Sequence, residues 1–163
     1  MALSIRPATI DDYDGVALVF DEIDALHRQA LPHIFRAVAG HALERAYFES
    51  TIADPEMDWI VAEHDGEIVG FISVRVLHAA DRPILAPRHF VEVDSLAVRA
   101  DHYRAGVGRA LMAAAERWVA ERGLHEIELS VWEFNQGALA FYEELGYITE
   151  RRKMRRDIDN GNS

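Results

Sequence analysis

The sequence predicts an α/β domain of the α+β kind, with a mixed, mostly antiparallel central sheet flanked by helices. Three observations carry this prediction. The expected elements follow the order β-α-α-β-β-β-α-β-α-β, a tight hairpin turn joins two early strands, and a β-α-β crossover comes late in the chain. The chain has 163 residues, half of them hydrophobic, which is enough to bury a core. We expect residues 1–157 to form a single domain and residues 158–163 a polar tail.

Hydrophobic periodicity and turn residues give the expected elements in order. The predicted strands cover residues 3–6, 59–63, 68–77, 90–98, 126–131 and 147–157, and the predicted helices cover about 9–30, 40–53, 107–122 and 135–145. Thr9 stands three residues before Asp12, a spacing typical of a capping box at a helix start. Asp65-Gly66 is typical of a two-residue hairpin turn. Gly123 and Gly146 are expected to end the last two helices.

Composition excludes several classes of function. The formal net charge is −11, which argues against general nucleic-acid binding because that activity needs a basic face. The chain has no cysteine, so disulfides, thiolate metal sites and cysteine nucleophiles are excluded. The eight histidines show no metal-binding spacing, and no metal is expected. No apolar stretch approaches the roughly 20 residues that span a bilayer, and no signal pattern opens the chain, so we expect a cytoplasmic protein without a membrane partner.

The segment of residues 98–109 leaves a predicted strand and enters a predicted helix. Gly106 and Gly108 lie at the helix start, where the missing side chains allow close approach of a ligand to the backbone. The first N–H groups of a helix have no intrahelical partner and carry partial positive charge, so they favour a phosphate group. Three residues add local positive charge: Arg99, Arg104 and Arg109. Taken alone, an ordinary strand–helix junction explains this segment equally well, and neither a P-loop nor a dinucleotide motif is present.

Two separated segments carry a resemblance to a known family. The first runs from Val93 to Arg109, and the second reads Asn-Gln-Gly-Ala-Leu-Ala-Phe-Tyr-Glu-Glu-Leu-Gly-Tyr from Asn135 to Tyr147. They resemble the GCN5-related N-acetyltransferase (GNAT) superfamily, whose motifs are Gln/Arg-x-x-Gly-x-Gly/Ala and Asn, Ala, Phe-Tyr and Leu-Gly-Phe/Tyr in that order. The hairpin around Asp65-Gly66 also looks like the central hairpin of the family. In this register Tyr103 occupies the usual Gln/Arg position, with an arginine beside it.

The resemblance implies the GNAT (acyl-CoA N-acyltransferase) fold and acetyl-CoA as the cosubstrate. It implies that backbone groups of Leu96, Ala97 and Val98 bind the pantetheine arm and the acetyl carbonyl in the manner of an added strand. Amides of the following loop and helix are implied to hold the pyrophosphate, namely those of Arg104, Ala105, Gly106, Val107, Gly108 and Arg109. The remaining implied cofactor-binding residues are Asn135, Phe141 and Tyr142, and Tyr142 is implied to face the thioester sulfur.

Two proton transfers are needed for acetyl transfer to an amine. A thiol ionises near pH 8.5 and a tyrosine near 10, so proton donation from Tyr142 to the leaving thiolate costs about 2 kcal/mol. A lysine-like amine ionises near 10.4, and its proton has to go to a base or to water. Family resemblance makes Glu92 the first candidate for this base. Asp94 shares its face if the strand is regular, and it either holds the positive charge of the substrate or acts as the base itself. Both carboxylates are also compatible with plain solvated strand residues.

The leading interpretation is an acetyl-CoA-dependent N-acetyltransferase that acts directly on a primary amine of a small molecule. In this superfamily the first two helices and the loop before the cofactor strand usually shape the acceptor pocket. The alternatives are a protein N-terminal or lysine acetyltransferase and a non-catalytic CoA-binding sensor. The partner is then a small-molecule amine, with neither nucleic acid nor a membrane involved. Relatives are commonly homodimers, and the sequence leaves that state open.

Overall fold

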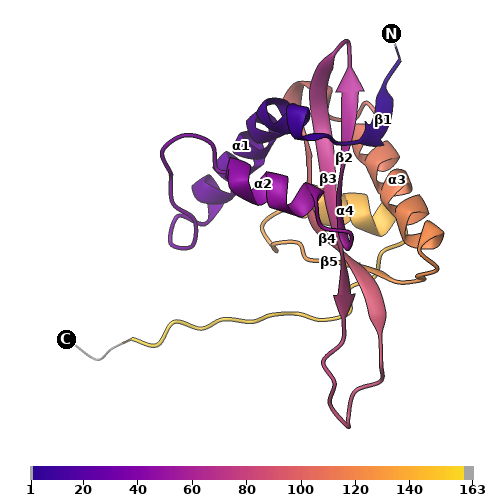
Figure 1. Cartoon of the computed structure of the whole chain (residues 1–163). Helices are drawn as coiled ribbons and strands as arrows, with labels where there is room; N and C mark the ends of the chain where they lie inside the picture. Colours follow the sequence, from indigo (N-terminus) through magenta and orange to yellow (C-terminus); the bar gives the residue numbers. More distant parts are fainter. Residues whose placement is uncertain (1, 160–163) are drawn as a thin grey trace. The chain divides into compact units, whose positions relative to one another are not determined.

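The computed structural model describes residues 2–159, which form two compact units that divide after Ser130 (Figure 1). In the first unit the strands are β1 (Ser4–Pro7), β2 (Met57–His64), β3 (Glu67–His78), β4 (His89–Val98) and β5 (Ile127–Leu129). Its α-helices are α1 (Tyr13–Ala30), α2 (Arg45–Ile52) and α3 (Val107–Glu121). The second unit contains α4 (Gln136–Glu144). The single domain expected over residues 1–157 stays a prediction, and the last four residues of the expected tail lie outside the described residues.

The five strands form one sheet in the order β1-β2-β3-β4-β5. The first three neighbouring pairs are antiparallel, and only β4 and β5 run parallel. The turn between β2 and β3 has positive φ at both Asp65 (54°) and Gly66 (79°), as a two-residue hairpin with right-handed strand twist requires. The predicted mixed, mostly antiparallel sheet is therefore confirmed.

Helices cover both faces of this sheet (Figure 1). On one face, buried residues of α1 and α2 pack in a single core with the sheet residues Trp59, Val61, Phe71 and Ala97. The neighbouring position on β3, Gly70, points to the opposite face because side chains alternate along a strand. A Cβ atom at Gly70 would lie 3.2 Å from the Leu111 side chain, so the glycine allows α3 to pack closely on that face.

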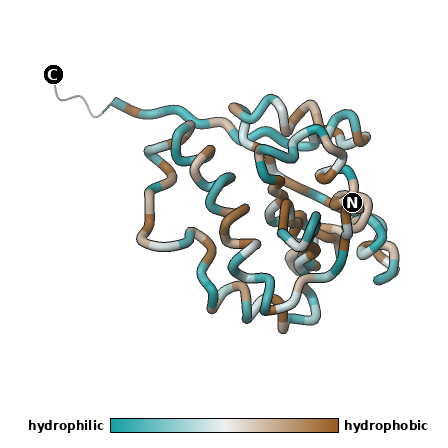
Figure 2. The backbone as a smooth tube through the Cα atoms, turned by 90° about the horizontal axis from the view of Figure 1, so that it is seen from above, coloured by the Kyte–Doolittle hydropathy of each residue, from teal (hydrophilic) through white to brown (hydrophobic). Residues whose placement is uncertain are grey.

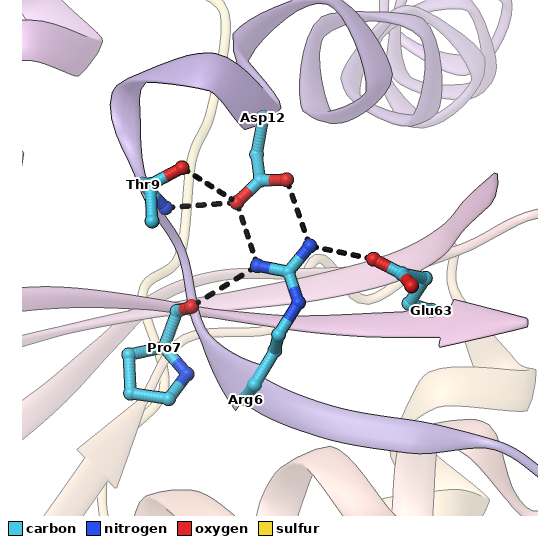
Figure 3. Close-up of polar contacts among 5 residues, drawn as sticks. All are labelled: Arg6, Pro7, Thr9, Asp12 and Glu63. Atoms are coloured by element: carbon cyan, nitrogen blue, oxygen red, sulfur yellow. Dashed lines mark hydrogen bonds and ion pairs between the residues drawn. The ribbon is translucent and has the colours of Figure 1, made fainter. Parts of the chain in front are cut away.

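A network of charged side chains around Arg6 lies between β1, β2 and the start of α1 (Figure 3). The Arg6 guanidinium of β1 donates to both carboxylate oxygens of Asp12 (2.8 and 2.9 Å) and to Glu63 of β2 (2.6 Å). The Thr9 backbone N–H donates to the same Asp12 carboxylate at 2.8 Å, which confirms the predicted capping box. The network fixes the turn between the first strand and the 3₁₀ helix (Ile10–Asp12) that leads into α1.

We expect Asp12→Asn to lower the free energy of unfolding by about 1.5–3 kcal/mol at neutral pH, the usual worth of hydrogen bonds to a charged group. The Arg6 guanidinium lowers the pKa of Asp12, so this stabilisation is present above about pH 3.9 and is lost as the pH falls through the lowered value. Urea unfolding at pH 7 and pH 3 measures both effects. The control is Asp11→Asn, which changes an exposed neighbour. Equal loss in the two variants would contradict the assignment.

Two expected elements differ from the structure in the first unit. The second helix begins at Arg45 rather than at residue 40, because Gly40 is left-handed (φ 74°) and Glu44 is extended (φ −72°, ψ 133°). The strand expected over 126–131 is shortened to Ile127–Leu129, the three residues that pair with β4. The other helix and strand bounds agree with the expected ones to within two residues, apart from the start of α1, which the 3₁₀ helix precedes.

The prediction of a strand over residues 147–157 is wrong. In the described part of the second unit this segment has no regular secondary structure and pairs with no strand. A strand needs a neighbour for its backbone groups, and apolar alternation does not supply one. Five of the six residues from 151 to 156 are basic, and their mutual repulsion opposes packing against each other. The segment is mostly hydrophilic along its length (Figure 2), and its few apolar side chains are exposed.

Candidate active site

The outer edge of β4 is open over the second half of the strand. β4 pairs with β3 along its whole length, from His89 to Val98. Its pairing with β5 covers only Val91 to Val93. The last five residues of β4 therefore have no strand partner on the β5 side among the described residues, and three of them are the predicted pantetheine-binding residues Leu96, Ala97 and Val98. An extended ligand fits such an edge as an added strand does.

The loop that follows β4 has the backbone shape of an anion-binding concavity. Gly106 is left-handed (φ 82°) and is the N-cap residue of α3, so the chain turns from left-handed to helical conformation at one peptide. Successive N–H groups in this conformation point into one hollow. The N-cap residue is a glycine and has no side chain that could cap α3, and the first amides of a helix have no intrahelical partner. Arg104 also has positive φ (63°), a strained conformation for a residue with a Cβ atom.

One charged side chain beside this loop has a different role from the expected one. Arg99 is held by Glu67 and Asp101, each at 3.2 Å, so its charge is shared within the protein. The Ala100 backbone N–H donates to Glu22 of α1 at 3.0 Å, which ties the loop to the first helix. Tyr103, at the usual Gln/Arg position, has a side chain that is more than half exposed (58%). The loop is thus fixed at its start, and its glycine-containing end leads into α3.

The two predicted acceptor-side carboxylates lie together. Arg75 of β3 stands directly opposite Glu92 of β4 and donates to its Oε1 from Nη2 (2.7 Å) and Nε (3.1 Å). The same Nη2 lies 3.2 Å from Oδ1 of Asp94. The strand is not regular here, because Ser73 pairs with Ser95 and Val74 with Val93, which leaves Asp94 as a bulge residue without a partner. Both carboxylates nevertheless contact Arg75, so they lie on the same face of the sheet beside the bulge.

In the second unit, the predicted site residues belong to α4 and its cap. The Asn135 side-chain oxygen accepts a hydrogen bond from the Ala138 backbone N–H at 3.1 Å, so it caps α4. The rings of Phe141 and Tyr142 are 5.1 Å apart in an edge arrangement. Burial raises the pKa of Tyr142 to about 12. A cofactor contact of Asn135, Phe141 or Tyr142 would join the two units, and it stays a prediction.

Sequence reasoning missed Arg75, although it organises both carboxylates. Its signal was weak, because the partner of Glu92 on β3 depends on the register across a 10-residue connection between β3 and β4 and on a bulge. The described residues contain no cluster of three or more metal-ligating side chains. Nor is any helix in the described range both long and apolar enough to cross a bilayer.

Comparison with protein families matches residues 21–147 to the Acetyltransferase (GNAT) family. The chain belongs to this family, as its sequence resemblance indicated.

Individual relatives agree with this membership. Mycothiol acetyltransferase of Streptomyces coelicolor is 36% identical over 100 residues, which cover 60% of this chain and only 30% of that protein. The chain thus spans about a third of the length of that relative. N-alpha-acetyltransferase of Sulfurisphaera tokodaii is 30% identical over 132 residues, 78% of this chain and 73% of that protein. A tetramutant of the BH1408 protein from Bacillus halodurans has the same fold, with a TM-score of 0.90 at 24% identity over 95% of this chain and 99% of that one.

Proposed function

We propose that the chain is an acetyl-CoA-dependent N-acetyltransferase that transfers the acetyl group directly to a primary amine of a small molecule. One observation carries this proposal: the open edge of β4 runs from Asp94 to Val98 and leads within eight residues to the left-handed Gly106 at the N-terminus of α3. Coenzyme A has two matching recognition features: an extended pantetheine arm, which can bind as a strand does, and an anionic pyrophosphate next to it. Family membership and the relative named for mycothiol support the same class of activity.

The residues of the first unit fit the coenzyme by chemistry. Backbone groups of Leu96, Ala97 and Val98 are placed on the edge that β5 leaves open, and they would hold the pantetheine arm. The pyrophosphate would bind the amides of residues 104–109, where the left-handed Gly106 and the positive end of the α3 dipole favour an anion. Acetyl-CoA would supply an activated acetyl thioester. The amine nitrogen would bond to the acetyl carbon, the C–S bond would break, and coenzyme A would leave as the thiol. The protein would bind and orient the two substrates and provide the proton acceptor and the proton donor.

The protons would be handled by two groups. On the acceptor side, Oε1 of Glu92 already accepts two hydrogen bonds from Arg75, so a proton from the amine would go to its other oxygen, to Asp94 or to water. On the leaving side, Tyr142 is the proposed donor to sulfur. With a pKa near 12 against about 8.5 for a thiol, full proton transfer costs roughly 5 kcal/mol. Tyr142 would therefore act mainly as a neutral hydrogen-bond donor to the developing thiolate.

A protein N-terminal acetyltransferase is the second candidate. The relative named N-alpha-acetyltransferase aligns over more than 70% of both chains, whereas this chain covers a small share of the mycothiol enzyme. The two candidates share the coenzyme site and differ on the acceptor side. A non-catalytic CoA-binding sensor would share only the coenzyme site.

The decisive test is calorimetry with acetyl-CoA followed by an acceptor screen. The proposal predicts saturable binding of acetyl-CoA and CoA release with small primary amines. Turnover with peptides bearing a free N-terminus, and none with small amines, would favour the second candidate. Binding without turnover on either panel would favour the sensor. No binding of the coenzyme would rule out all three.

We expect Glu92→Gln to lower kcat/KM most at low pH, where the amine is fully protonated and needs a base. At high pH a larger share of the amine is already neutral, so the kcat/KM of the variant approaches that of the wild type. A pH–rate profile of the two proteins with one amine measures this difference. The control is Glu128→Gln, which removes the neighbouring carboxylate of β5 that Arg88 holds at 3.0 Å. A profile unchanged in Glu92→Gln would remove Glu92 as the base.

A further inference from the structure

Two histidines and a glutamate meet where β3 ends and β4 begins. His78, the last residue of β3, stands directly opposite His89, the first residue of β4. The Nδ1 atoms of the two rings lie 2.5 Å apart, closer than in an ordinary hydrogen bond. On the other side of the His78 ring, Nε2 lies 2.9 Å from Oε1 of Glu56. The three side chains thus form a continuous chain from carboxylate to imidazole to imidazole.

This cluster is separate from the acceptor-side carboxylates. His89 precedes Glu92 by three residues on β4, and His78 follows Arg75 by three residues on β3. Side chains alternate along a strand, so both histidines point to the face opposite to that of Arg75 and Glu92. A function of the histidine pair is therefore independent of the proposed acetyl transfer.

Glu56 determines which nitrogen of His78 offers a lone pair. A carboxylate accepts hydrogen bonds, so a neutral His78 carries its proton on Nε2 and donates it to Glu56. The lone pair of Nδ1 then points at Nδ1 of His89. In metal centres a carboxylate that accepts from the second nitrogen of a ligating histidine fixes the ring in this way. The His78 ring is thus oriented as a metal ligand is.

The charges around the pair favour a cation. Glu56 places a negative charge behind the His78 ring. Arg88 directly precedes His89, but its guanidinium is held by Glu126 and Glu128, so its positive charge is balanced within the protein. Both histidine side chains are exposed, and water can reach an ion that lies between them.

We propose that His78 and His89 bind a divalent transition-metal ion, of the class of Zn²⁺, Ni²⁺ and Cu²⁺, through their two Nδ1 atoms, with water as the remaining ligands. Imidazole nitrogen suits these ions. In a tetrahedral site with metal–nitrogen distances of about 2.0–2.1 Å the two nitrogens stand about 3.3 Å apart, so the rings separate by about 0.8 Å. The proton on Nδ1 of His89 moves to its Nε2, and both lone pairs then face the ion. Glu56 is a positioning residue that does not touch the ion.

Such an ion would join the ends of β3 and β4 at the base of the loop of residues 79–88. One backbone hydrogen bond, from the Ala79 N–H to the Arg88 carbonyl oxygen at 2.9 Å, continues the pairing beyond the histidines. Farther along the loop the side chain of Ile84 is 81% exposed. A bridge between the two strand ends would hold the first and last residues of this loop together.

The first test measures binding of the metal ions alone. Full-length protein without a polyhistidine tag is treated with EDTA, dialysed, and titrated by calorimetry at neutral pH with Zn²⁺, Ni²⁺, Cu²⁺ and Mg²⁺. We expect one saturable site in the wild type that prefers Cu²⁺ and does not bind Mg²⁺. His78→Ala and His89→Ala are each expected to raise the Kd about tenfold or more. For Glu56→Gln we expect a rise of about tenfold, the lower end of the range for such orienting partners.

His41→Ala is the matched control for the histidine variants. His41 is also exposed and lies 2.6 Å from a carboxylate, that of Asp21, but no second imidazole nitrogen faces its ring within hydrogen-bond distance among the described residues. Its loss is expected to leave the Kd unchanged. All variants are expected to keep the wild-type Kd for acetyl-CoA, which also shows that they are folded.

The second test locates the ion by hydrogen exchange. Zn²⁺ is expected to slow exchange of the amides of residues 78–89 about threefold or more in the wild type, and not in His89→Ala. No saturable binding of the three ions, or an unchanged Kd in both His78→Ala and His89→Ala, would overturn the inference. So would protection of another segment instead. An unchanged Kd in Glu56→Gln alone would overturn the positioning role of Glu56. A wild type that acetylates no amine would leave the metal site standing.

Discussion

Replacing Gly106 with alanine is expected to weaken acetyl-CoA binding by tenfold or more. Gly106 is left-handed (φ 82°), and an L-residue with a Cβ atom adopts that conformation at a cost of about 1–2 kcal/mol. The loop would relax toward negative φ, and the amides at the start of α3 would no longer point into one hollow. Because these amides hold the pyrophosphate in the proposed site, calorimetry with acetyl-CoA measures the loss directly.

Gly40 offers a matched control for this change. It is also left-handed (φ 74°), and an added Cβ atom would meet no atom within 4 Å at either glycine. Alanine at the two positions therefore imposes a similar local strain, and the two variants should lose similar stability in urea unfolding. Only Gly106→Ala is expected to change the Kd for acetyl-CoA. An equal Kd in the two variants would mean that the loop before α3 does not hold the coenzyme.

Tyr142→Phe is expected to lower kcat about a hundredfold while the Kd for acetyl-CoA changes little, because general acid groups contribute about 10²–10⁴ to a rate. The lower end of that range applies because burial raises the pKa of Tyr142 to about 12, which makes the phenol a weak acid. The same shift keeps the phenol protonated throughout the usual assay range. Any loss of activity with rising pH between pH 8 and 10 is therefore expected to be the same in wild type and variant.

Tyr103→Phe is the control for the tyrosine change. Its hydroxyl belongs to an exposed side chain, and coenzyme binding in the proposed site depends on backbone amides. We expect kcat and Kd close to those of the wild type. A Tyr142→Phe variant with undiminished kcat, or a variant whose kcat falls only with the Kd for acetyl-CoA, would show that Tyr142 is not the donor to sulfur.

Local signals in the sequence were sufficient for most of the fold. Asp65-Gly66 predicted the hairpin because only certain residues tolerate positive φ at both central positions. The Thr9 and Asp12 spacing predicted the helix start because capping is a contact between near neighbours. The strand expected over 147–157 failed for the opposite reason. Its existence depends on a partner elsewhere in the chain, and apolar alternation does not specify that partner.

The candidate site shows the same difference between local sequence signals and contacts between distant parts of the chain. The glycine of the loop before α3 and the carboxylates of β4 could be identified from the sequence because their residue types carry the chemistry. Arg75 could not, since its importance comes from cross-strand register and from the bulge at Asp94.

The short pairing between β4 and β5 has a consequence for how the proposed site would accommodate a coenzyme. Only three residues of each strand are joined, and the remaining donors and acceptors on that side of β4 are left for another occupant. A longer β5 and the pantetheine arm would compete for the same row of backbone groups. In the proposed site a small molecule would complete the sheet where β5 stops, and the length of β5 would set how much of that row the coenzyme could occupy.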